Sequence, residues 1–301
     1  MIFVKSKKPF ILLGMICTLL IGLIGIGAVA FITLLERKVL GITQVRLGPN
    51  KVSFRGVLQP VADGVKLLTK QNTRTKLRHR GLFRVRPCLL IGLYLLLWRS
   101  VTPWEGGSLN KHSLLLFFSL LGVGAYAVIL TGWSSTRRFS KLGSLRGVLQ
   151  RLSYEVALIL VFLYFIILVK NYNFTPIRVK IRKELLIFWV ALWLILALIE
   201  TNRAPFDLLE GERELIRGFN IEIGRLMFVY LFLREYGILI IISIVSDLIL
   251  TGGVGLIRLL FIRLFLLFRS CYPRLKYDSL IRIIWQSILP IRALTTYWVY
   301  F

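Results

Sequence analysis

The sequence has few of the side chains that bind metals or form disulfides. Its 301 residues include only three cysteines and two histidines. Cys17, Cys88 and Cys271 lie far apart and none belongs to a C-x-x-C pair, so no disulfide framework, zinc site or iron–sulfur cluster is predicted. A membrane haem held by two histidines is also excluded, because only His79 and His112 are present and His79 lies in a basic loop. If the protein takes part in a redox reaction, other proteins must carry the electrons.

Acidic residues are also scarce. There are 14 Asp and Glu residues against 40 Lys and Arg residues, which gives a formal net charge of +26. A charge of this size is typical of nucleic-acid binding, but here the basic residues alternate with long apolar runs and leave no basic domain free to form a groove. We therefore expect no nucleic-acid partner, and anionic lipid as the counter-charge.

Long apolar runs dominate the rest of the chain. Hydrophobic residues make up 56% of it and the mean hydropathy is +0.75, which is typical of polytopic helical membrane proteins. The sequence therefore predicts an all-α fold in a single transmembrane domain over residues 1–301, without an internal repeat. About eight spans are expected, near residues 10–35, 87–101, 113–132, 157–169, 185–199, 226–250, 255–267 and 281–300.

Eight spans place both termini on one side of the membrane. The first loop, Arg37 to Arg86, contains thirteen Lys or Arg residues by count, and the positive-inside rule places it on the cytoplasmic or matrix side. Within this loop, apolar residues between Val57 and Leu68 recur near helical spacing. They predict an amphipathic helix that lies at the membrane surface.

Several carboxylates occur where an apolar environment makes a charge costly. Four lie inside or at the edge of predicted spans, and a fifth lies on the amphipathic helix: Glu36, Glu155, Glu200, Glu235 and Asp63. Buried carboxyl groups can take up and release protons near neutral pH, so this pattern is typical of a proton relay. The alternative is that each acid pairs with an arginine and only fixes packing, Glu36 with Arg37 or Arg46 and Glu235 with Arg234.

An acidic loop at residues 202–225 adds to this set. Seven of the fourteen acidic residues lie between Glu200 and Glu235, and the loop itself contains Asp207, Glu210, Glu212, Glu214 and Glu222. Acidic loops on the water side are often simply solvated. The hypothesis is that this one docks a peripheral subunit and forms one wall of a cavity near the membrane surface.

The chain resembles a known family over residues 34–278. The matching stretches, in family order, are LLERKVLG from Leu34, QVRLGPNK from Gln44, LQPVADGVKL from Leu58, GWSS from Gly132, SYE from Ser153, ETNRAPFD from Glu200, GFNIE from Gly218 and YPRLKYD from Tyr272. They are similar to subunit 1 of respiratory complex I, the proton-pumping NADH:ubiquinone oxidoreductase, in its mitochondrial form. The resemblance implies a multi-pass protein of the mitochondrial inner membrane, with eight helices, both termini on the intermembrane-space side and the acidic loop on the matrix side.

The resemblance also implies roles for individual residues. The subunit would enclose much of the ubiquinone tunnel and would bind no cofactor covalently, since flavin and iron–sulfur clusters belong to partner subunits. Tunnel residues would be Glu36, Arg37, Arg46, Phe219 and Phe228. The proton-coupling carboxylates would be Asp63, Glu155, Glu200, Asp207, Glu210, Glu212, Glu222 and Glu235, with Arg146, Arg203 and Arg274 as charge partners. Other complex I subunits would be the partners, including peripheral-arm subunits at the quinone site and small neighbouring membrane subunits.

Some residues depart from the family pattern. Leu47 stands where relatives usually have Lys or Arg, and five arginines stand where relatives usually have serine or another small residue: Arg86, Arg137, Arg213, Arg217 and Arg234. Four more lie within or near the spans: Arg99, Arg258, Arg263 and Arg292. Two explanations are open. The arginines are real and extend to lipid phosphate, or some correspond to AGA and AGG codons that several animal mitochondria read as serine.

Three other functions are alternatives to a complex I subunit. The membrane subunit of an energy-converting hydrogenase would share the coupling loop but would lack a quinone tunnel. A stand-alone proton-coupled transporter would use buried carboxylates too, but it should show repeat symmetry and broken helices around a midplane site. A non-catalytic membrane scaffold would tolerate the neutralisation of Glu155 or Glu200.

Overall fold

The computed structural model describes residues 7–70, 80–101, 112–135, 138–169, 172, 183–207, 225–251 and 255–300. Within these ranges the long elements are helices, which confirms the predicted all-α fold. They are α1 (Lys7–Thr43), α3 (Arg80–Val101), α4 (Ser113–Ser134), α5 (Arg138–Val169), α6 (Lys183–Glu200), α8 (Arg225–Thr251) and α9 (Gly255–Cys271). The last helix runs through α10 (Tyr277–Arg282), a π-helical stretch η4 (Ile283–Ile288) and α11 (Leu289–Tyr300).

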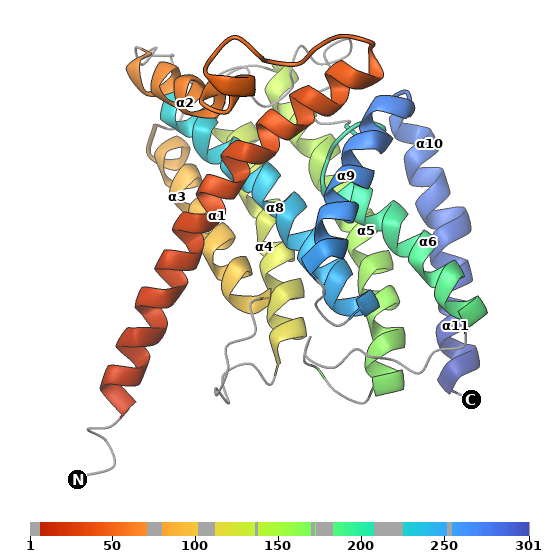
Figure 1. Cartoon of the computed structure of the whole chain (residues 1–301). Helices are drawn as coiled ribbons and strands as arrows, with labels where there is room; N and C mark the ends of the chain where they lie inside the picture. The colour runs from red at the N-terminus through yellow and green to blue at the C-terminus, as the bar shows by residue number, and fades with distance from the viewer. Residues whose placement is uncertain are drawn as a thin grey trace.

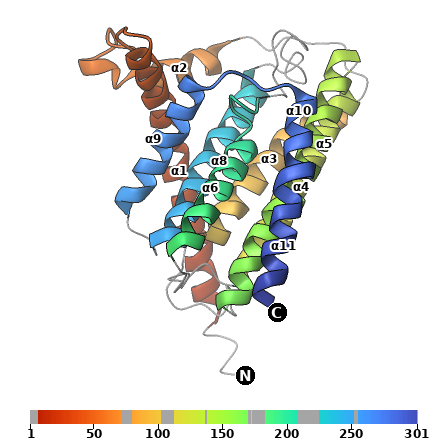
Figure 2. The same cartoon turned by 90° about the vertical axis from the view of Figure 1, so that its right-hand side faces the viewer.

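The helices form one bundle of steeply inclined segments (Figure 1). α3 packs between α4 and α8, α9 packs on α8, and α11 lies against α5 (Figure 2). The 37 residues of α1 span about 55 Å at 1.5 Å per residue, and its first half leans away from the other helices in Figure 1. α1 starts and α11 ends at the same end of the bundle, as expected for an even number of passes.

Each predicted span lies inside a helix, and the fourth corresponds to the second half of a longer helix. The expected start was Ala157, whereas α5 begins at Arg138 and continues to Val169. Its first half is rich in Ser, Gly, Lys and Arg, which lowers the hydropathy that defined the span.

The first half of α5 has its polar side chains inside and its leucines outside. Ser140 and Gln150 are fully buried, while the leucines on the opposite side are more than half exposed: Leu142, Leu145, Leu149 and Leu152 at 52–58%. In water this arrangement would expose apolar surface and bury polar groups, both at a cost. In lipid the outward leucines face acyl chains, so the pattern fits a helix that meets a membrane along its length.

Two helices are long and apolar enough to cross a membrane on length and composition alone. Among the described residues these are Ser113–Ser134, which is α4, and Phe228–Ile249 within α8. Cys88–Val101 and Trp189–Glu200 are shorter apolar helices. The count of eight spans therefore stays a prediction.

The predicted amphipathic segment is a helix, α2 (Gln59–Thr69), which begins with Pro60 in its first turn. It follows a short 3-10 turn, η1 (Phe54–Gly56), and contacts α1 and α8. Its apolar side chains point outward, with Val61, Val65 and Leu68 between 51% and 58% exposed. The helix lies at the end of the bundle opposite to the start of α1 (Figure 1).

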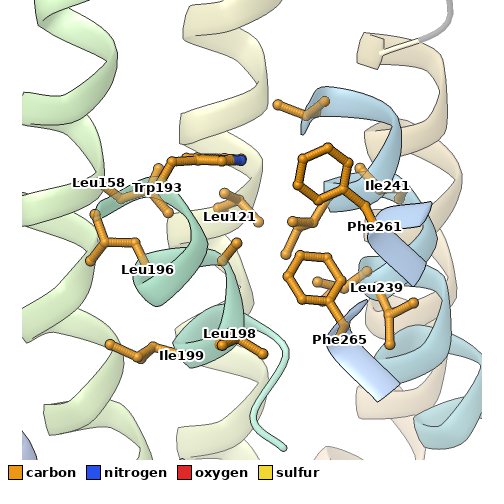
Figure 3. Close-up of a cluster of buried hydrophobic side chains, with 14 of the residues drawn as sticks. Leu121, Leu158, Trp193, Leu196, Leu198, Ile199, Leu239, Ile241, Phe261 and Phe265 are labelled. Carbon is orange, nitrogen blue, oxygen red and sulfur yellow. The ribbon is translucent and has the colours of Figure 1, made fainter. Parts of the chain in front are cut away.

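The apolar core lies where α4, α5, α6, α8 and α9 meet (Figure 3). Trp189 and Trp193 stack with ring centroids 5.9 Å apart, and Phe162 meets Trp193 edge-on at 5.1 Å. The indole N–H of Trp193 donates to Ser246 Oγ of α8 at 2.9 Å, so this large side chain is both packed and hydrogen-bonded. Phe261 and Phe265 bring α9 onto the same core.

Gly237 permits the close approach of α3 and α8, and this contact can be tested. A Cβ at residue 237 would stand 2.1 Å from the ring of Tyr94, which is itself buried. We expect Gly237→Ala to lower stability by about 1–3 kcal/mol through overpacking, seen as a lower thermal unfolding midpoint of the protein in detergent. Gly27→Ala on α1 is the control, because a Cβ there meets nothing within 4 Å and alanine favours the helix. Equal midpoints for the two variants would contradict the prediction.

Candidate functional site

The candidate site begins at Glu200, the last residue of α6. The helix ends there because Asn202 adopts a left-handed backbone, with φ of 49°, and Pro205 follows. The side chain of Glu200 is buried, at 3% exposure. The hydroxyl of Tyr154 donates to its Oε2, and Arg151 Nη2 lies 3.9 Å from its Oε1. Both partners come from α5.

α5 presents a polar face toward Glu200. Arg151, Tyr154 and Glu155 are three and four residues apart, so their side chains share one side of the helix. Glu155, Arg151, Tyr154 and Glu200 line a cavity of about 10 Å³, closed by Leu121 and Leu158. A cavity of that size with several polar walls holds about one water molecule.

A second cavity joins Glu200 to Glu235 of α8. Its volume is about 20 Å³, and its polar lining comprises Arg151, Glu200, Thr201, Asn202, Arg234 and Glu235. Arg151 and Glu200 line both cavities. The structure thus brings the predicted carboxylates Glu155, Glu200 and Glu235, which come from three helices, around two adjacent small polar spaces.

Glu36 forms a second cluster at the end of α1. It is 3% exposed and contacts two guanidinium groups: Arg203 Nη1 donates to its Oε2 at 2.8 Å, and Arg269 Nη1 contacts its Oε1. The guanidinium carbon of Arg203 also lies 3.9 Å from the ring centroid of Tyr236 on α8. The expectation that Glu36 pairs with Arg37 or Arg46 was wrong. Its partners come from the turn after α6 and the end of α9, because α1 buries Glu36 while its neighbour points elsewhere.

Arg37 and Arg46 lie on the outer side of this end of the bundle. Arg37 Nη1 donates to Asp63 Oδ2 at 2.7 Å, and Gln59 Nε2 donates to Asp63 Oδ1 at 3.0 Å. The Arg37 side chain is half exposed, so this pair joins α1 to α2 near solvent. Arg46 is exposed in the turn that follows α1. The structure therefore keeps Asp63 apart from the buried carboxylates of the two cavities.

The turn from Thr201 to Asp207 is held from two sides. Arg274 Nη2 donates to Asp207 Oδ2 at 3.1 Å, and the Leu275 N–H donates to the Pro205 carbonyl at 3.0 Å. On the other side, Gln150 Nε2 of α5 donates to the Phe206 carbonyl at 3.2 Å. The family resemblance implies that Arg274 is a charge partner of the acidic residues, and in the structure its partner is Asp207.

Of the remaining predicted residues, the structure describes Arg146 and Phe228. Arg146 lies 5.9 Å from the ring of Tyr277, and Phe228 is half-buried with its ring 4.5 Å from that of Phe232. Glu210, Glu212, Glu214, Glu222, Phe219, Arg137, Arg213 and Arg217 lie outside the described residues, as does the side chain of Arg86. No group of three or more metal-binding side chains occurs in the part of the chain that is described.

Sequence reasoning missed several polar partners. Arg151, Tyr154 and Arg269 contact the predicted acids, and Asp247, fully buried in α8, pairs with Arg258 Nε of α9 at 2.7 Å. Arg151 and Tyr154 could have been found, because they lie on the helical face of Glu155. Asp247 is a single acid near the end of an apolar run and gave no such signal.

The buried arginines bear on the two explanations for the arginine excess. Arg99 and Arg263 are exposed and can reach lipid phosphate, but Arg151 and Arg234 are only 4% and 8% exposed. Both guanidinium groups reach the same residue, Gly124 of α4, whose added Cβ would lie 2.3 Å from Arg234 Nη2 and 2.7 Å from Arg151 Nη1. Arg151 Nε and Nη1 and Arg234 Nε have no hydrogen-bond partner among the described residues. Two adjacent buried guanidinium groups repel each other, and Arg151 has the Glu200 carboxylate at 3.9 Å, so the cost falls mainly on Arg234.

This cost leads to a prediction about residue 234. We expect peptides of the protein isolated from its native membrane to contain serine at this position, and the intact mass to be lower by the arginine-to-serine difference at each recoded codon. Peptide mass spectrometry measures this directly, and peptides covering Arg151, Arg203 and Arg274, whose guanidiniums lie against carboxylates, serve as internal controls that keep arginine. Arginine at 234 would refute the prediction.

Comparison with known proteins places these residues in a family. A family model described as NADH dehydrogenase matches residues 16–300. Among similar proteins, the NADH-ubiquinone oxidoreductase chain 1 of Aedes aegypti is 39% identical, covering 93% of this chain and 92% of that protein. The protein of the same name from Paracentrotus lividus is 39% identical over 88% and 87%, and that from Xenopus laevis 38% identical over 90% and 89%. The match includes the helices that carry Glu36, Glu155, Glu200 and Glu235, and the chain belongs to the NADH dehydrogenase chain 1 family.

Proposed function

We propose that the chain is the membrane subunit of mitochondrial NADH:ubiquinone oxidoreductase that links quinone binding to proton movement. Relatives that carry this enzyme's name cover most of the chain, which supports a role within complex I, with ubiquinone as the substrate. The chain acts as an enzyme only within the assembly. Flavin and iron–sulfur clusters would be held by partner subunits, and the peripheral-arm subunits would dock on the acidic loop at 202–225.

The observation that carries the proton-coupling role is the grouping of Glu155, Glu200 and Glu235. The three carboxylates come from α5, α6 and α8 and surround two small cavities that share Glu200. Each cavity has room for about one water molecule, and water between carboxylates can pass a proton over a short distance. A purely structural set of ion pairs would need no adjoining cavities.

The quinone role is supported by an apolar groove between α1, α3 and α8. The groove has a volume of about 310 Å³ and is lined by Gly22, Leu23, Ile26, Ile91, Tyr94, Leu95, Tyr230, Leu233 and Arg234. Its walls are almost entirely apolar apart from two tyrosines and residue 234, so it suits a hydrocarbon chain. Residue 234 of α8 lines both this groove and the larger polar cavity, and the groove therefore lies next to Glu200 and Glu235. We assign the isoprenoid tail of ubiquinone to this groove.

The topology follows from the same proposal. The eight helical passes would cross the inner membrane, and the outward leucines of α5 support membrane contact for a helix with low hydropathy. The basic first loop and α2 would lie on the matrix side, close to the anionic lipid surface, with both termini on the intermembrane-space side.

The first test replaces Glu200 by glutamine in the intact enzyme, using the counterpart residue in a relative whose gene can be altered. Glutamine keeps the size and a hydrogen bond to Tyr154 but cannot ionise. We expect NADH-to-ubiquinone turnover and coupled proton movement to fall by roughly tenfold or more, with assembly intact.

Asp278→Asn is the matched control, since it removes an exposed carboxylate from the start of α10. Turnover and proton movement of the control should stay near the unmodified values. Normal values for Glu200→Gln as well would make Glu200 a structural residue and would favour the scaffold alternative.

The second test blocks the groove. Leu23→Trp adds a large side chain to the groove wall, so the apparent KM for a long-tailed quinone should rise by about fivefold, while the KM for a short-tailed analogue should change little. Leu20→Trp changes an exposed residue of the same helix that does not line the groove, and it should leave both values unchanged. An equal rise for both quinones would argue against a tail site.

A further inference from the structure

Arg269 stands out because Glu36 already has a partner in Arg203. A buried carboxylate needs one cation for charge balance, yet Glu36 contacts two, one through each oxygen. The two arginines come from different parts of the chain: Arg203 from the turn after α6, and Arg269 from the last turn of α9. Neutralising the charge of Glu36 therefore does not by itself account for Arg269.

The contact between Arg269 and Glu36 affects how Arg203 can bind the same carboxylate. Arg269 contacts Oε1 of Glu36, while Arg203 donates to Oε2 through a single nitrogen and keeps its guanidinium over the ring of Tyr236. Without Arg269, both oxygens would be free for a bidentate pair with Arg203. Such a pair would draw the guanidinium off Tyr236 and move the turn that carries it.

The turn that carries Arg203 follows directly after Glu200, one of the three carboxylates at the two cavities. Arg203 lies three residues after Glu200, and Thr201 and Asn202 line the same cavity as Glu200 and Glu235. The segment that follows Arg269 holds the far end of the turn through Arg274 and the Leu275 N–H. The residues after α9 thus hold the Thr201–Asp207 turn directly at Pro205 and Asp207, and Arg269 reaches it at Arg203 through Glu36.

We propose that Arg269 is a positioning residue that, through Glu36 and Arg203, fixes the turn so that Glu200 stays at its two cavities. The inference rests on the proposed proton-coupling role of Glu200 and names a residue that controls it. Arg269 itself touches neither the cavities nor the groove, since it is absent from their linings.

The test compares Arg269→Gln with Arg263→Gln in the intact, membrane-bound enzyme. Both variants remove one positive charge from α9, but Arg263 is exposed. We expect Arg269→Gln to lower kcat of NADH-to-ubiquinone turnover by about tenfold, the usual effect of losing one charged hydrogen bond, with the KM for long-tailed quinone little changed. Arg263→Gln should match the unmodified enzyme. Arg269→Lys, which keeps a charged donor for Glu36, should recover most of the activity.

A double-mutant cycle separates positioning from general damage. If Arg269 acts through Glu36, the double variant Glu36→Gln with Arg269→Gln should be no worse than the poorer single variant, because both changes interrupt the same contact. Losses that multiply, a Lys variant as impaired as the Gln variant, or normal turnover in Arg269→Gln would each overturn the inference. If Arg269→Gln prevents assembly, the Lys variant decides: high activity supports the inference and low activity in an assembled enzyme overturns it.

The Glu200→Gln variant distinguishes the two proposals. If it has normal turnover and proton movement, the proposed function fails whatever Arg269 does. If it is impaired while Arg269→Gln is normal, the coupling role stands and only the positioning role is lost.

Discussion

The burial of charged groups between helices is the constraint on which the structure depends. Glu36 and Glu200 are each only 3% exposed, and an isolated carboxylate in such a place would cost several kcal/mol. Each is therefore bound by groups from other elements, Glu200 by α5 and Glu36 by the turn after α6 and by α9. These contacts fix how α1, α5, α6 and α9 pack at one end of the bundle. The same contacts that assemble the helices also define the candidate site.

The positions of the helices could be predicted from hydropathy, except where polar residues face inward. Seven of the expected spans fill most of the helices that contain them, but α5 starts 19 residues before the expected fourth span, which begins at Ala157. Its first half buries Ser140, Ser144 and Gln150 and exposes leucines. A sliding hydropathy average cannot recognise such a helix, because it adds the two faces together. A search for helical periodicity in which polar residues form the buried face and leucines form the outer face would have found the first half of α5.

The carboxylates could be predicted from the sequence, but their partners could not. An acid at the end of an apolar run is visible in one dimension, whereas Glu36 and Arg203 are 167 residues apart. The sequence offered Arg37 or Arg46 as the partner of Glu36 because both are near in the chain, yet Arg37 is adjacent on the same helix, and adjacent residues on a helix point in different directions. The resemblance to the family implied Arg203 and Arg274 as charge partners. Neither the resemblance nor spacing along the chain indicated Arg269. Long-range pairing depends on how helices pack, which the pattern of a single sequence does not contain.

One short segment connects the two polar clusters. Within eight residues, Glu200 reaches Tyr154 and Arg151 of α5, Arg203 reaches Glu36 of α1 and Tyr236 of α8, and Asp207 reaches Arg274 after α9. Hydrogen bonds from Gln150 and Leu275 hold its backbone between these ends. Arg203, which binds Glu36, lies only three residues after Glu200, so a short stretch of backbone joins the two clusters. Under the proposed coupling role, this turn is the covalent connection between the charged cluster at Glu36 and the carboxylates at the two cavities.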